Sequence, residues 1–411
     1  MNEIRKKSKF SVSSLVFIIL CSVFLLLSCN SGQQDSVSEE IPESSVKTSE
    51  NTKDDPFHVI AYVTVPASEN WRWIGTKGDE HTNPVSEVDT RYVTHINFAF
   101  GMIEALQFEE GSDGRPKMEG QIASREAYKD PEDGQYHYRA TVNGWIEEME
   151  TTVEGERYLK ALVKLKEEKP DLKVLLSIGG WDSDGFCYMA QTEEGRKEFI
   201  ESCIQLLNEY QLDGIDLDWE YPTNGGWGAI ASCENCVSDA KMLLTEFREA
   251  LNDEFEDSEK LLTIASGCSQ PWVDSDALKA LDYINVMCYD YSPGSGQDMA
   301  GLELGSKFMQ DHLNMVGDSE ENRAKLNLGI PFYNEGGPYL VPYYKPYEGH
   351  IDASPEITEE KMNWVKDNGY GGAFYWAYSM DVFSQDVEDE NDPKIKILQR
   401  TVYETLNGAV K

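Results

Sequence analysis

The segment from Asp213 to Pro222 places acidic residues at alternate positions of an otherwise apolar run. Side chains alternate along a β-strand, so Asp216, Asp218 and Glu220 share one face, with steps of roughly 6.6–6.8 Å between them. Carboxyl groups lined up inside a protein repel one another and lose solvation, so at least one of them holds a proton at neutral pH. Such an array is costly, and it indicates acid–base chemistry rather than a structural role.

A calcium site is the main alternative for this run of carboxylates. An EF-hand loop has the pattern D-x-D-x-D-G with a late Glu, in a turn. The spacers here are the bulky apolar residues Ile215, Leu217 and Trp219, which suit the opposite face of a strand packed under helices. None of the six histidines is spaced as a His-x-x-x-His ligand pair. We therefore expect no metal and no organic cofactor.

The elements that position these acids are strands and helices in alternation. From Phe57 onward, near-continuous apolar runs are separated by amphipathic helical stretches, a pattern that predicts a parallel sheet buried on both faces. The expected strands are Val59–Val63, His95–Phe100, Val174–Ile178, Gly214–Glu220, Leu262–Ala265, Tyr283–Tyr289, Leu326–Ile330 and Ala373–Tyr378. The expected helices include Gly155–Glu168, Gly195–Tyr210, Asp239–Glu254 and Pro355–Asp367. Ser354 before the last helix and Gly369 after it are typical cap residues.

Eight strand–helix repeats predict an α/β fold, a single closed (β/α)8 TIM barrel over residues 56–408. A doubly wound open sheet is the alternative, but such a sheet more often has a Gly-rich phosphate turn after its first strand. Here Thr64-Val65-Pro66 follows that strand. The longest connection, Gly101–Glu154 after the second strand, is acidic and rich in turn residues, so we expect a loop on one rim rather than a separate domain.

Five segments resemble, in the right order, those of glycoside hydrolase family 18. The run from Asp213 to Glu220 resembles the D-x-x-D-x-D-x-E signature of that family, and its Trp-Glu-Tyr-Pro ending has the form seen in chitinases. The other four segments are Leu176–Trp181, Met287–Asp290, Leu328–Tyr333 and Gly371–Trp376. Asn334 stands where the family usually has Gly. The resemblance covers essentially the whole globular part.

The resemblance implies a retaining hydrolysis in which the 2-acetamido group of the substrate acts as the nucleophile. Glu220 would be the general acid, and it would later activate water. Asp218 would hydrogen-bond the acetamido nitrogen, while Asp216 would take up or share a proton as Asp218 turns toward Glu220. Tyr289 would hydrogen-bond the acetamido oxygen. Asp213 has a spacing that puts it off the inward face, so we expect it to be structural support.

The resemblance also implies a set of substrate-binding residues. Asp290 would bind the sugar near the acetamido group, and Trp376 would form the floor under the −1 sugar, because apolar sugar faces pack on indole. Met287 belongs to the same set, and Tyr62 is a weaker candidate for the wall of the substrate cleft. Ser177 would steady the Asp216 region by hydrogen bonding. Plain core packing is the alternative for each aromatic residue.

The expected activity is that of a monomeric, endo-acting chitinase on chitin or N-acetylglucosamine oligosaccharides. One alternative is an endo-β-N-acetylglucosaminidase that cuts the chitobiose core of N-glycans, which the Trp-Glu-Tyr-Pro form disfavours. The other is a chitin-binding lectin on the same barrel, which typically lacks the acid that Glu220 supplies here. The net charge of −38 argues against a nucleic acid or an anionic membrane surface as the main partner, because both attract basic surfaces.

The shape of the substrate cleft depends on the connection after the seventh strand. Many chitinases of this family carry an α+β insertion domain there, which walls one side of a deep groove. The segment Asn334–Ser354 is long for a βα loop but too short for a domain with its own core. We therefore expect no α+β insertion, an open groove and endo-type cleavage.

The first 28 residues resemble the signal peptide of a bacterial lipoprotein. Four basic residues precede the apolar run Leu15–Leu27, which is shorter than the roughly 20 residues that span a bilayer core. Leu26-Leu27-Ser28-Cys29 resembles a lipobox, so Cys29 is the expected lipidation site; an ordinary signal peptide is the alternative. Residues 30–55 are rich in Ser, Glu, Asp and Thr and predict a disordered tether. The protein is therefore expected outside the cell membrane, anchored by lipid to the cell envelope.

Six cysteines fall in the globular part, and export permits disulfides there. Cys233-x-x-Cys236 could be a local bridge or half of a zinc site. No second C-x-x-C and no His pair accompanies it, which disfavours the metal. The spacing leaves the pairing of Cys187, Cys203, Cys233, Cys236, Cys268 and Cys288 open.

Overall fold

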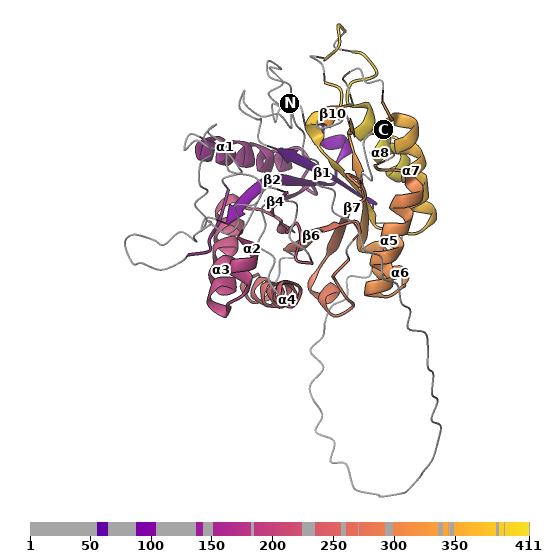
Figure 1. Ribbon diagram of the computed structural model, residues 1–411. Coiled ribbons are helices and arrows are strands. Elements are labelled where there is room, and N and C mark those ends of the chain that lie inside the picture. Colours follow the sequence, from indigo (N-terminus) through magenta and orange to yellow (C-terminus); the bar gives the residue numbers. More distant parts are fainter. Residues whose placement is uncertain are drawn as a thin grey trace, which may run out of the picture. The chain divides into compact units, whose positions relative to one another are not determined.

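The computed structural model describes most of the predicted barrel domain (Figure 1). The described residues are 56–64, 88–103, 137–142, 151–181, 185–223, 235–255, 260–269, 271–291, 299–335, 340–343, 345, 349–383, 386–389 and 391–410. The predicted signal peptide, Cys29 and the tether lie outside these residues, and so do Cys233 and most of Gly101–Glu154.

A closed barrel of eight parallel strands forms the centre of the described chain. Each strand pairs with the next around the barrel, and β1 pairs with both β2 and β11, which closes the ring. The strands are β1 (His58–Thr64), β2 (His95–Ile103), β4 (Lys173–Gly179), β5 (Gly214–Asp218), β6 (Leu261–Gly267), β7 (Tyr283–Met287), β8 (Leu326–Pro331) and β11 (Gly372–Trp376). The predicted TIM barrel is therefore confirmed, with its eight strands at the eight expected places.

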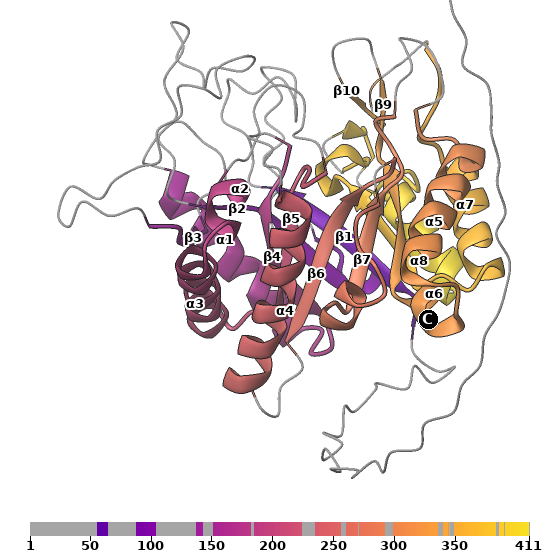
Figure 2. The ribbon, with the colours of Figure 1, turned by 60° about the horizontal axis from the view of Figure 1, so that its bottom comes forward.

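The helices lie outside the barrel, where their apolar faces cover the strands. They are α1 (Thr151–Lys164), α2 (Phe186–Ala190), α3 (Glu193–Tyr210), α4 (Cys236–Glu254), α5 (Leu302–Val316), α6 (Glu320–Ala324), α7 (Pro355–Asp367) and α8 (Ile397–Asn407). In Figure 2, α3 and α4 lie on one side of the strands and α5 to α8 on the other. None of the helices in the described ranges is long and apolar enough to cross a membrane.

Capping residues explain where two of these helices begin. The helix α7 has the predicted bounds, and the Ser354 hydroxyl accepts a hydrogen bond from the Ile357 amide. The helix α3 begins at Glu193, two residues before the predicted start, because the Thr192 hydroxyl caps it by accepting from the Gly195 amide.

Two short antiparallel additions extend the loops above the barrel. The strand β2 runs three residues past its predicted end, because β3 (Ala140–Thr141) supplies hydrogen-bonding partners for Met102 and Ile103. After β8, a hairpin of β9 (Tyr333–Glu335) and β10 (Leu340–Pro342) occupies part of the predicted rim loop. The Asn334 side chain accepts hydrogen bonds from the Asp352 and Ala353 amides at 2.7 and 3.1 Å, which ties the two ends of this loop together.

The outward face of β5 packs in the core between the barrel and its helices. Ile215, Leu217 and Trp219 are buried, as their apolar character predicts. The Trp219 ring stacks on Phe186 of α2, with ring centroids 5.2 Å apart and planes 10° from parallel. This packing fixes the rotation of β5 about its own axis, and therefore directs the alternate, acidic side chains into the barrel.

Cysteines lie at several buried positions around the barrel. Cys236, at the start of α4, is disulfide-bonded, and its Sγ lies 3.1 Å from the Cys187 Sγ in α2. The local bridge predicted from the C-x-x-C spacing requires Cys233, which lies outside the described residues. Cys203, Cys268 and Cys288 are buried thiols.

Candidate active site

Three carboxyl side chains rise along β5 from the interior of the barrel toward its C-terminal rim. Asp216 is fully buried, Asp218 is 4% exposed, and Glu220, two residues past the end of the strand, is 8% exposed. The negative charges of Glu220 and Asp216 both act on Asp218, as expected if the three side chains share one face. Active sites of TIM barrels lie at this C-terminal end of the strands.

Asp216 is surrounded by hydrogen-bond donors from four other strands. Its Oδ2 accepts from the Tyr62 hydroxyl of β1 at 2.8 Å and from the Ser177 hydroxyl of β4 at 2.7 Å. Its Oδ1 accepts from the Thr263 hydroxyl of β6 at 2.5 Å and, at 3.4 Å, from the Asn285 amide of β7. Burial raises the pKa of Asp216 above its ordinary value, and these donors act against that rise because they favour the charged form.

Asp218 has the opposite surroundings. Its Oδ1 is buried without a hydrogen-bond partner among the described residues. Burial, followed by the negative charges of Glu220 and Asp216, raises the pKa of Asp218 well above its ordinary value. Of the two aspartates, Asp218 therefore has the greater tendency to hold a proton at neutral pH.

Glu220 lies at the rim beside an aromatic side chain from the next position. The Tyr221 ring is 6.4 Å from the Trp181 ring, centroid to centroid, and a side chain at Gly267 of β6 would collide with it. Burial and the neighbouring Glu220 carboxylate raise the pKa of Tyr221 well above its ordinary value. Tyr221 thus remains a neutral phenol that can donate a hydrogen bond to the acid.

The Gly-Gly pair after β4 supports the end of the carboxylate strand. Gly179 and Gly180 have φ angles of +123° and +93°, which glycine adopts without strain. The Gly180 amide donates to the Asp218 carbonyl at 2.9 Å. A Cβ atom at Gly179 would clash with that same carbonyl oxygen. This close approach is the physical reason for two glycines after Ser177-Ile178.

The residues after β7 form a second wall. Tyr289 is buried, and its ring lies edge-on to the rings of Tyr333 and Phe374 at 6.4 and 6.0 Å. Burial, with Asp290 and the carboxylate row, raises the pKa of Tyr289 well above its ordinary value, so its hydroxyl stays protonated. Asp290 is exposed, has a φ of +57°, and accepts a hydrogen bond from the Tyr333 hydroxyl at 2.7 Å. Met287, at the end of β7, is 7% exposed.

Trp376 closes the other side, at the end of β11. Its indole is partly buried and stacks on Phe100 of β2, with centroids 5.5 Å apart and planes 22° from parallel. The Tyr62 ring lies edge-on to it at 6.0 Å. The structure thus brings four of the predicted residues to the same end of the barrel as the acids: Tyr62 on β1, Met287 at the end of β7, Tyr289 just after β7, and Trp376 on β11.

Comparison with known proteins decides the family. The model of the glycosyl hydrolases family 18 matches residues 68–338. This chain belongs to glycoside hydrolase family 18. Chitinase A1 of Niallia circulans is 30% identical to it over 340 residues, covering 71% of this chain and 47% of that protein. Probable chitinase 2 of Drosophila melanogaster is 28% identical over 361 residues, covering 79% and 64%. The family 18 chain therefore spans less than two thirds of the length of these relatives.

A solved structure shows the same fold. Catalytic domain 2 of the Group II chitinase of Ostrinia furnacalis superposes on this family 18 chain with a TM-score of 0.61, at 20% sequence identity. The match covers 86% of this chain and 97% of that one.

The first acid of the family 18 signature has a structural position. Asp213 precedes β5, at the N-terminal end of the barrel, and its carboxylate accepts from the Lys166 ammonium at 2.7 and 2.8 Å. It also accepts from the Val174 amide at 2.8 Å. Asp213 therefore joins the starts of β4 and β5, in agreement with the supporting role expected for it.

Sequence reasoning missed several residues of this family 18 site. Thr263 and Asn285 contact Asp216, and Asn327 of β8 donates to the Asn285 side chain. Each is a lone polar residue inside an apolar run, which could have marked it as facing the barrel interior. The Tyr62 hydroxyl contact to Asp216 was also not expected, because Tyr62 was assigned to the wall of the cleft.

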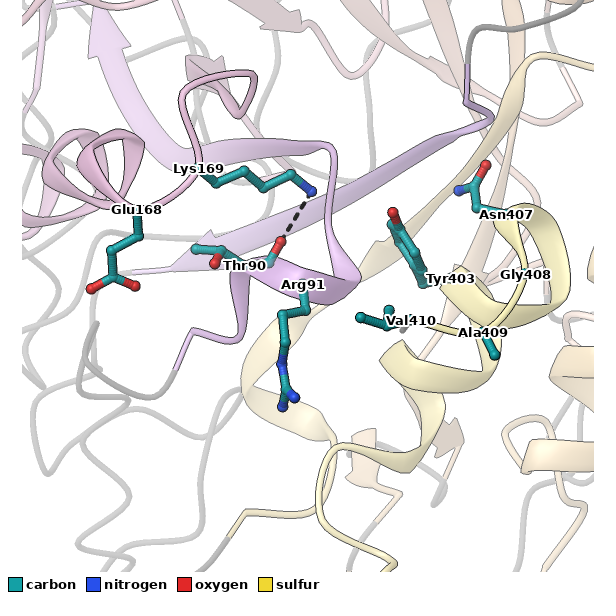
Figure 3. Close-up of a pocket in the computed structure, with 9 residues that line it drawn as sticks. All are labelled: Thr90, Arg91, Glu168, Lys169, Tyr403, Asn407, Gly408, Ala409 and Val410. Carbon is teal, nitrogen blue, oxygen red and sulfur yellow. Dashed lines mark hydrogen bonds between the residues drawn. The ribbon is translucent and has the colours of Figure 1, made fainter.

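A cavity of about 330 Å³ lies at the other end of the family 18 barrel (Figure 3). Its lining includes Arg91, Lys169, Tyr403 and Asn407. The Lys169 ammonium already donates to two backbone carbonyls, and Arg91 pairs with Asp89 through two hydrogen bonds. Both cationic side chains therefore already have hydrogen-bond partners, and the lining of the cavity includes none of the predicted site residues. The described part of the chain contains no group of three His, Cys, Asp or Glu residues placed to hold a metal ion.

Proposed function

We propose that this protein is a retaining chitinase that hydrolyses β-1,4-linked N-acetylglucosamine polymers. The observation that carries the proposal is the graded row of acids on β5, which leads from the buried Asp216 through Asp218 to Glu220 at the rim. The relatives named as chitinases support the choice of polymer. The reaction requires no metal or organic cofactor, because the substrate supplies its own nucleophile.

In the proposed first step, Glu220 protonates the glycosidic oxygen as the bond to the anomeric carbon breaks. The carbonyl oxygen of the substrate 2-acetamido group attacks the same carbon and forms an oxazolinium ring. In the second step, Glu220 takes a proton from water, whose oxygen opens the ring with retained configuration. Two inversions at one carbon explain the retention.

Asp218 and Tyr289 orient the acetamido group in this proposal. Asp218 accepts a hydrogen bond from the acetamido nitrogen and stabilises the positive charge that develops on the ring. The Tyr289 hydroxyl donates to the acetamido oxygen, a role that suits a phenol held neutral by its surroundings. Asp216 supplies a further negative charge below Asp218, and Ser177 and Tyr62 hold that carboxyl in place.

The sugar itself rests on the side chains that surround the acids. Trp376 forms the floor beneath the −1 sugar, because a partly exposed indole presents a flat apolar surface to the apolar face of a pyranose. The exposed Asp290 carboxylate, held by Tyr333, binds a sugar hydroxyl near the acetamido group. Met287 fills the space at the end of β7 against the same ring.

We further propose that the enzyme is monomeric, acts in the middle of the polymer chain and is weakly processive. The support for this proposal is the length of the connection after β8, Asn334–Ser354, which is too short for a domain with its own core and is expected to leave that side of the groove open. A rapid fall in the viscosity of a soluble chitin derivative would support endo-action, whereas fast release of disaccharide with little viscosity change would contradict it.

The proposed location of the enzyme is the cell envelope, outside the cell membrane, with a lipid on Cys29 as the anchor. The observation behind it is the lipobox-like Leu26-Leu27-Ser28-Cys29 after a short apolar run. Partition of a Cys29→Ser variant between membrane and soluble fractions tests it. Membrane association that persists in this variant would contradict lipid anchoring.

The activity is tested by product profiles on chitooligosaccharides and on a high-mannose glycopeptide, run side by side with the Glu220→Gln variant. We expect cleavage of the oligosaccharides and a loss of turnover of at least about 100-fold in the variant, because the amide keeps the shape but has no proton to transfer. Oligosaccharide binding by the variant should persist. Cleavage of the glycopeptide alone would instead indicate an endo-β-N-acetylglucosaminidase, and binding without turnover by the native protein would indicate a lectin.

A further inference from the structure

A chain of hydrogen bonds runs through the barrel interior from its N-terminal end to Asp216. His58, the first residue of β1, contacts the Asn327 Oδ1 of β8 through its Nδ1 at 3.0 Å. The Asn327 Nδ2 donates to the Asn285 Oδ1 of β7 at 3.0 Å. The Asn285 Nδ2 in turn points to the Asp216 Oδ1 and to the Tyr62 hydroxyl, each at 3.4 Å.

In this series of hydrogen bonds every group donates in the same direction, toward Asp216. The Asn327 Oδ1 can only accept, so the contacting His58 nitrogen carries the hydrogen. Both amides then point their N–H groups toward β5, and each donor hydrogen lies on the side of the carboxylate. A series of aligned dipoles with positive ends toward Asp216 favours the negative charge on that group.

The remaining positions around the Asp216 carboxylate are filled by hydroxyl donors. Thr263 is the closest, at 2.5 Å to Oδ1, and Tyr62 and Ser177 both contact Oδ2. A hydroxyl has a single hydrogen, and the structure gives each of these three no other acceptor within the described residues. A protonated Asp216 would force one of them to turn away, with its hydrogen left unbonded in the interior.

We propose that Thr263 and Asn285, with Asn327 and His58 behind them, are positioning residues that keep Asp216 ionised, so that Asp218 carries the proton of the pair at rest. The inference rests on the proposed function and extends it to residues that do not touch substrate. It specifies where the exchangeable proton of the row resides before Glu220 acts. Asp218 has no donor to satisfy its Oδ1, which agrees with a neutral carboxyl there.

Titratable groups lie at both ends of this series of hydrogen bonds. Asp216 faces Tyr62 from β1 and Asp218 from its own strand, whereas the residues of β4, β6 and β7 that contact it, Ser177, Thr263 and Asn285, are neutral. At the far end, His58 lies against the rings of His95 from β2 and Tyr283 from β7, at 5.4 and 3.9 Å. Burial, followed by the charges of His58 and Lys173, lowers the pKa of His95 well below its ordinary value, so His95 adds no charge at neutral pH.

Two substitutions of Thr263 separate the contribution of its hydroxyl donor from that of its methyl group. Thr263→Val keeps the shape and removes the hydrogen-bond donor, and Thr263→Ser keeps the donor and removes only the methyl group. For Thr263→Val we expect kcat on a soluble chitooligosaccharide to fall roughly 10- to 100-fold, the range that corresponds to one hydrogen bond to a charged group. The acid limb of its pH profile should move to higher pH, because loss of a donor makes Asp216 easier to protonate. KM should change little, and Thr263→Ser should retain the native profile.

A third variant tests the chain behind Asn285. Asn327→Leu removes the donor that orients the Asn285 side chain, and it does not touch Asp216. We expect the acid limb to shift in the same direction as in Thr263→Val, by a smaller amount. If Thr263→Val proves unstable, Thr263→Ala supplies the same loss of donor with less crowding, and melting temperatures of all variants identify folding defects.

Two outcomes would overturn the whole proposal, and a third would overturn its part concerning Asn327 and His58. The first is a native pH profile in Thr263→Val or Thr263→Ala. The second is equal impairment of the serine and valine variants, which would indicate packing of the methyl group instead of charge stabilisation. The third, an Asn327→Leu variant with a lower melting temperature but a native pH profile, would remove Asn327 and His58 from the proposal. Lack of chitooligosaccharide cleavage by the native protein would instead count against the proposed function.

Discussion

At the scale of single residues, the three acids of β5 are distinguished by their neighbours and not by their type. Asp216 is surrounded by donors, whereas Asp218 has a buried oxygen without a partner and two negative neighbours. The alternation of the acids was predictable from the sequence. Ser177 was expected as a donor, but Thr263 and Asn285 were not, because they reach Asp216 only through the register of β5, β6 and β7. Polar residues inside apolar strands mark the interior of a barrel, but register decides which of them meet.

The raised pKa of Asp218 leads to a prediction for Asp218→Asn. The substitution prevents Asp218 from acquiring a negative charge when its own proton is lost at higher pH, so Glu220 should then lose its proton more easily. We expect the alkaline limb of the kcat/KM profile to move to lower pH, and kcat to fall by roughly 100-fold or more. Steady-state kinetics across the pH range measure both effects. An alkaline limb that stays in place would show that Asp218 and Glu220 are not electrostatically coupled.

At the scale of elements, apolar patterning predicted the strands well and capping predicted helix ends less completely. The run Tyr283–Tyr289, for example, was expected as a strand, and β7 covers its first five residues, of which four are buried. The strand β3 was missed because two residues carry no periodicity, and it exists only as a partner for the end of β2. The earlier start of α3 depends on Thr192, whose hydroxyl caps the helix. The predicted start followed the apolar pattern, which begins further along the chain.

Substitution of Asp213 tests how the starts of two strands are held together, separately from catalysis. It joins the starts of β4 and β5 through Lys166 and the Val174 amide, far down the strands from Glu220. Asp213→Ala should lower the free energy of unfolding by about 1–3 kcal/mol, because the Val174 donor loses its acceptor. Urea denaturation measures this, with Lys166→Met as the matched control for loss of the ion pair alone. The kcat per folded molecule should remain native; a selective loss of kcat in a stable variant would place Asp213 in the catalytic machinery.

At the scale of the whole barrel, the two ends of the described chain meet at the face opposite the acids. The Phe57 amide donates to the Asn407 Oδ1 at 2.8 Å, and the Asn407 Nδ2 donates to the Phe57 carbonyl at 3.1 Å. Asn407 is the last residue of α8, and Phe57 directly precedes β1. Phe57 therefore enters the barrel at its N-terminal face, opposite the rim that carries Glu220 and Trp376.

This arrangement predicts which residues at the start of the chain the barrel needs for its stability. A protein that starts at residue 56 should have the same unfolding free energy as the full chain, because it retains the Phe57–Asn407 pair that closes the barrel. In that shortened protein, Asn407→Ala should lower the unfolding free energy by about 1–2 kcal/mol, the net value of two partly buried hydrogen bonds. Asn407→Asp is the matched control, since it retains the acceptor for the Phe57 amide and should recover part of the loss. Chemical denaturation of the four proteins measures these differences. A large loss on removal of residues 1–55 alone would show that the domain begins earlier than residue 56.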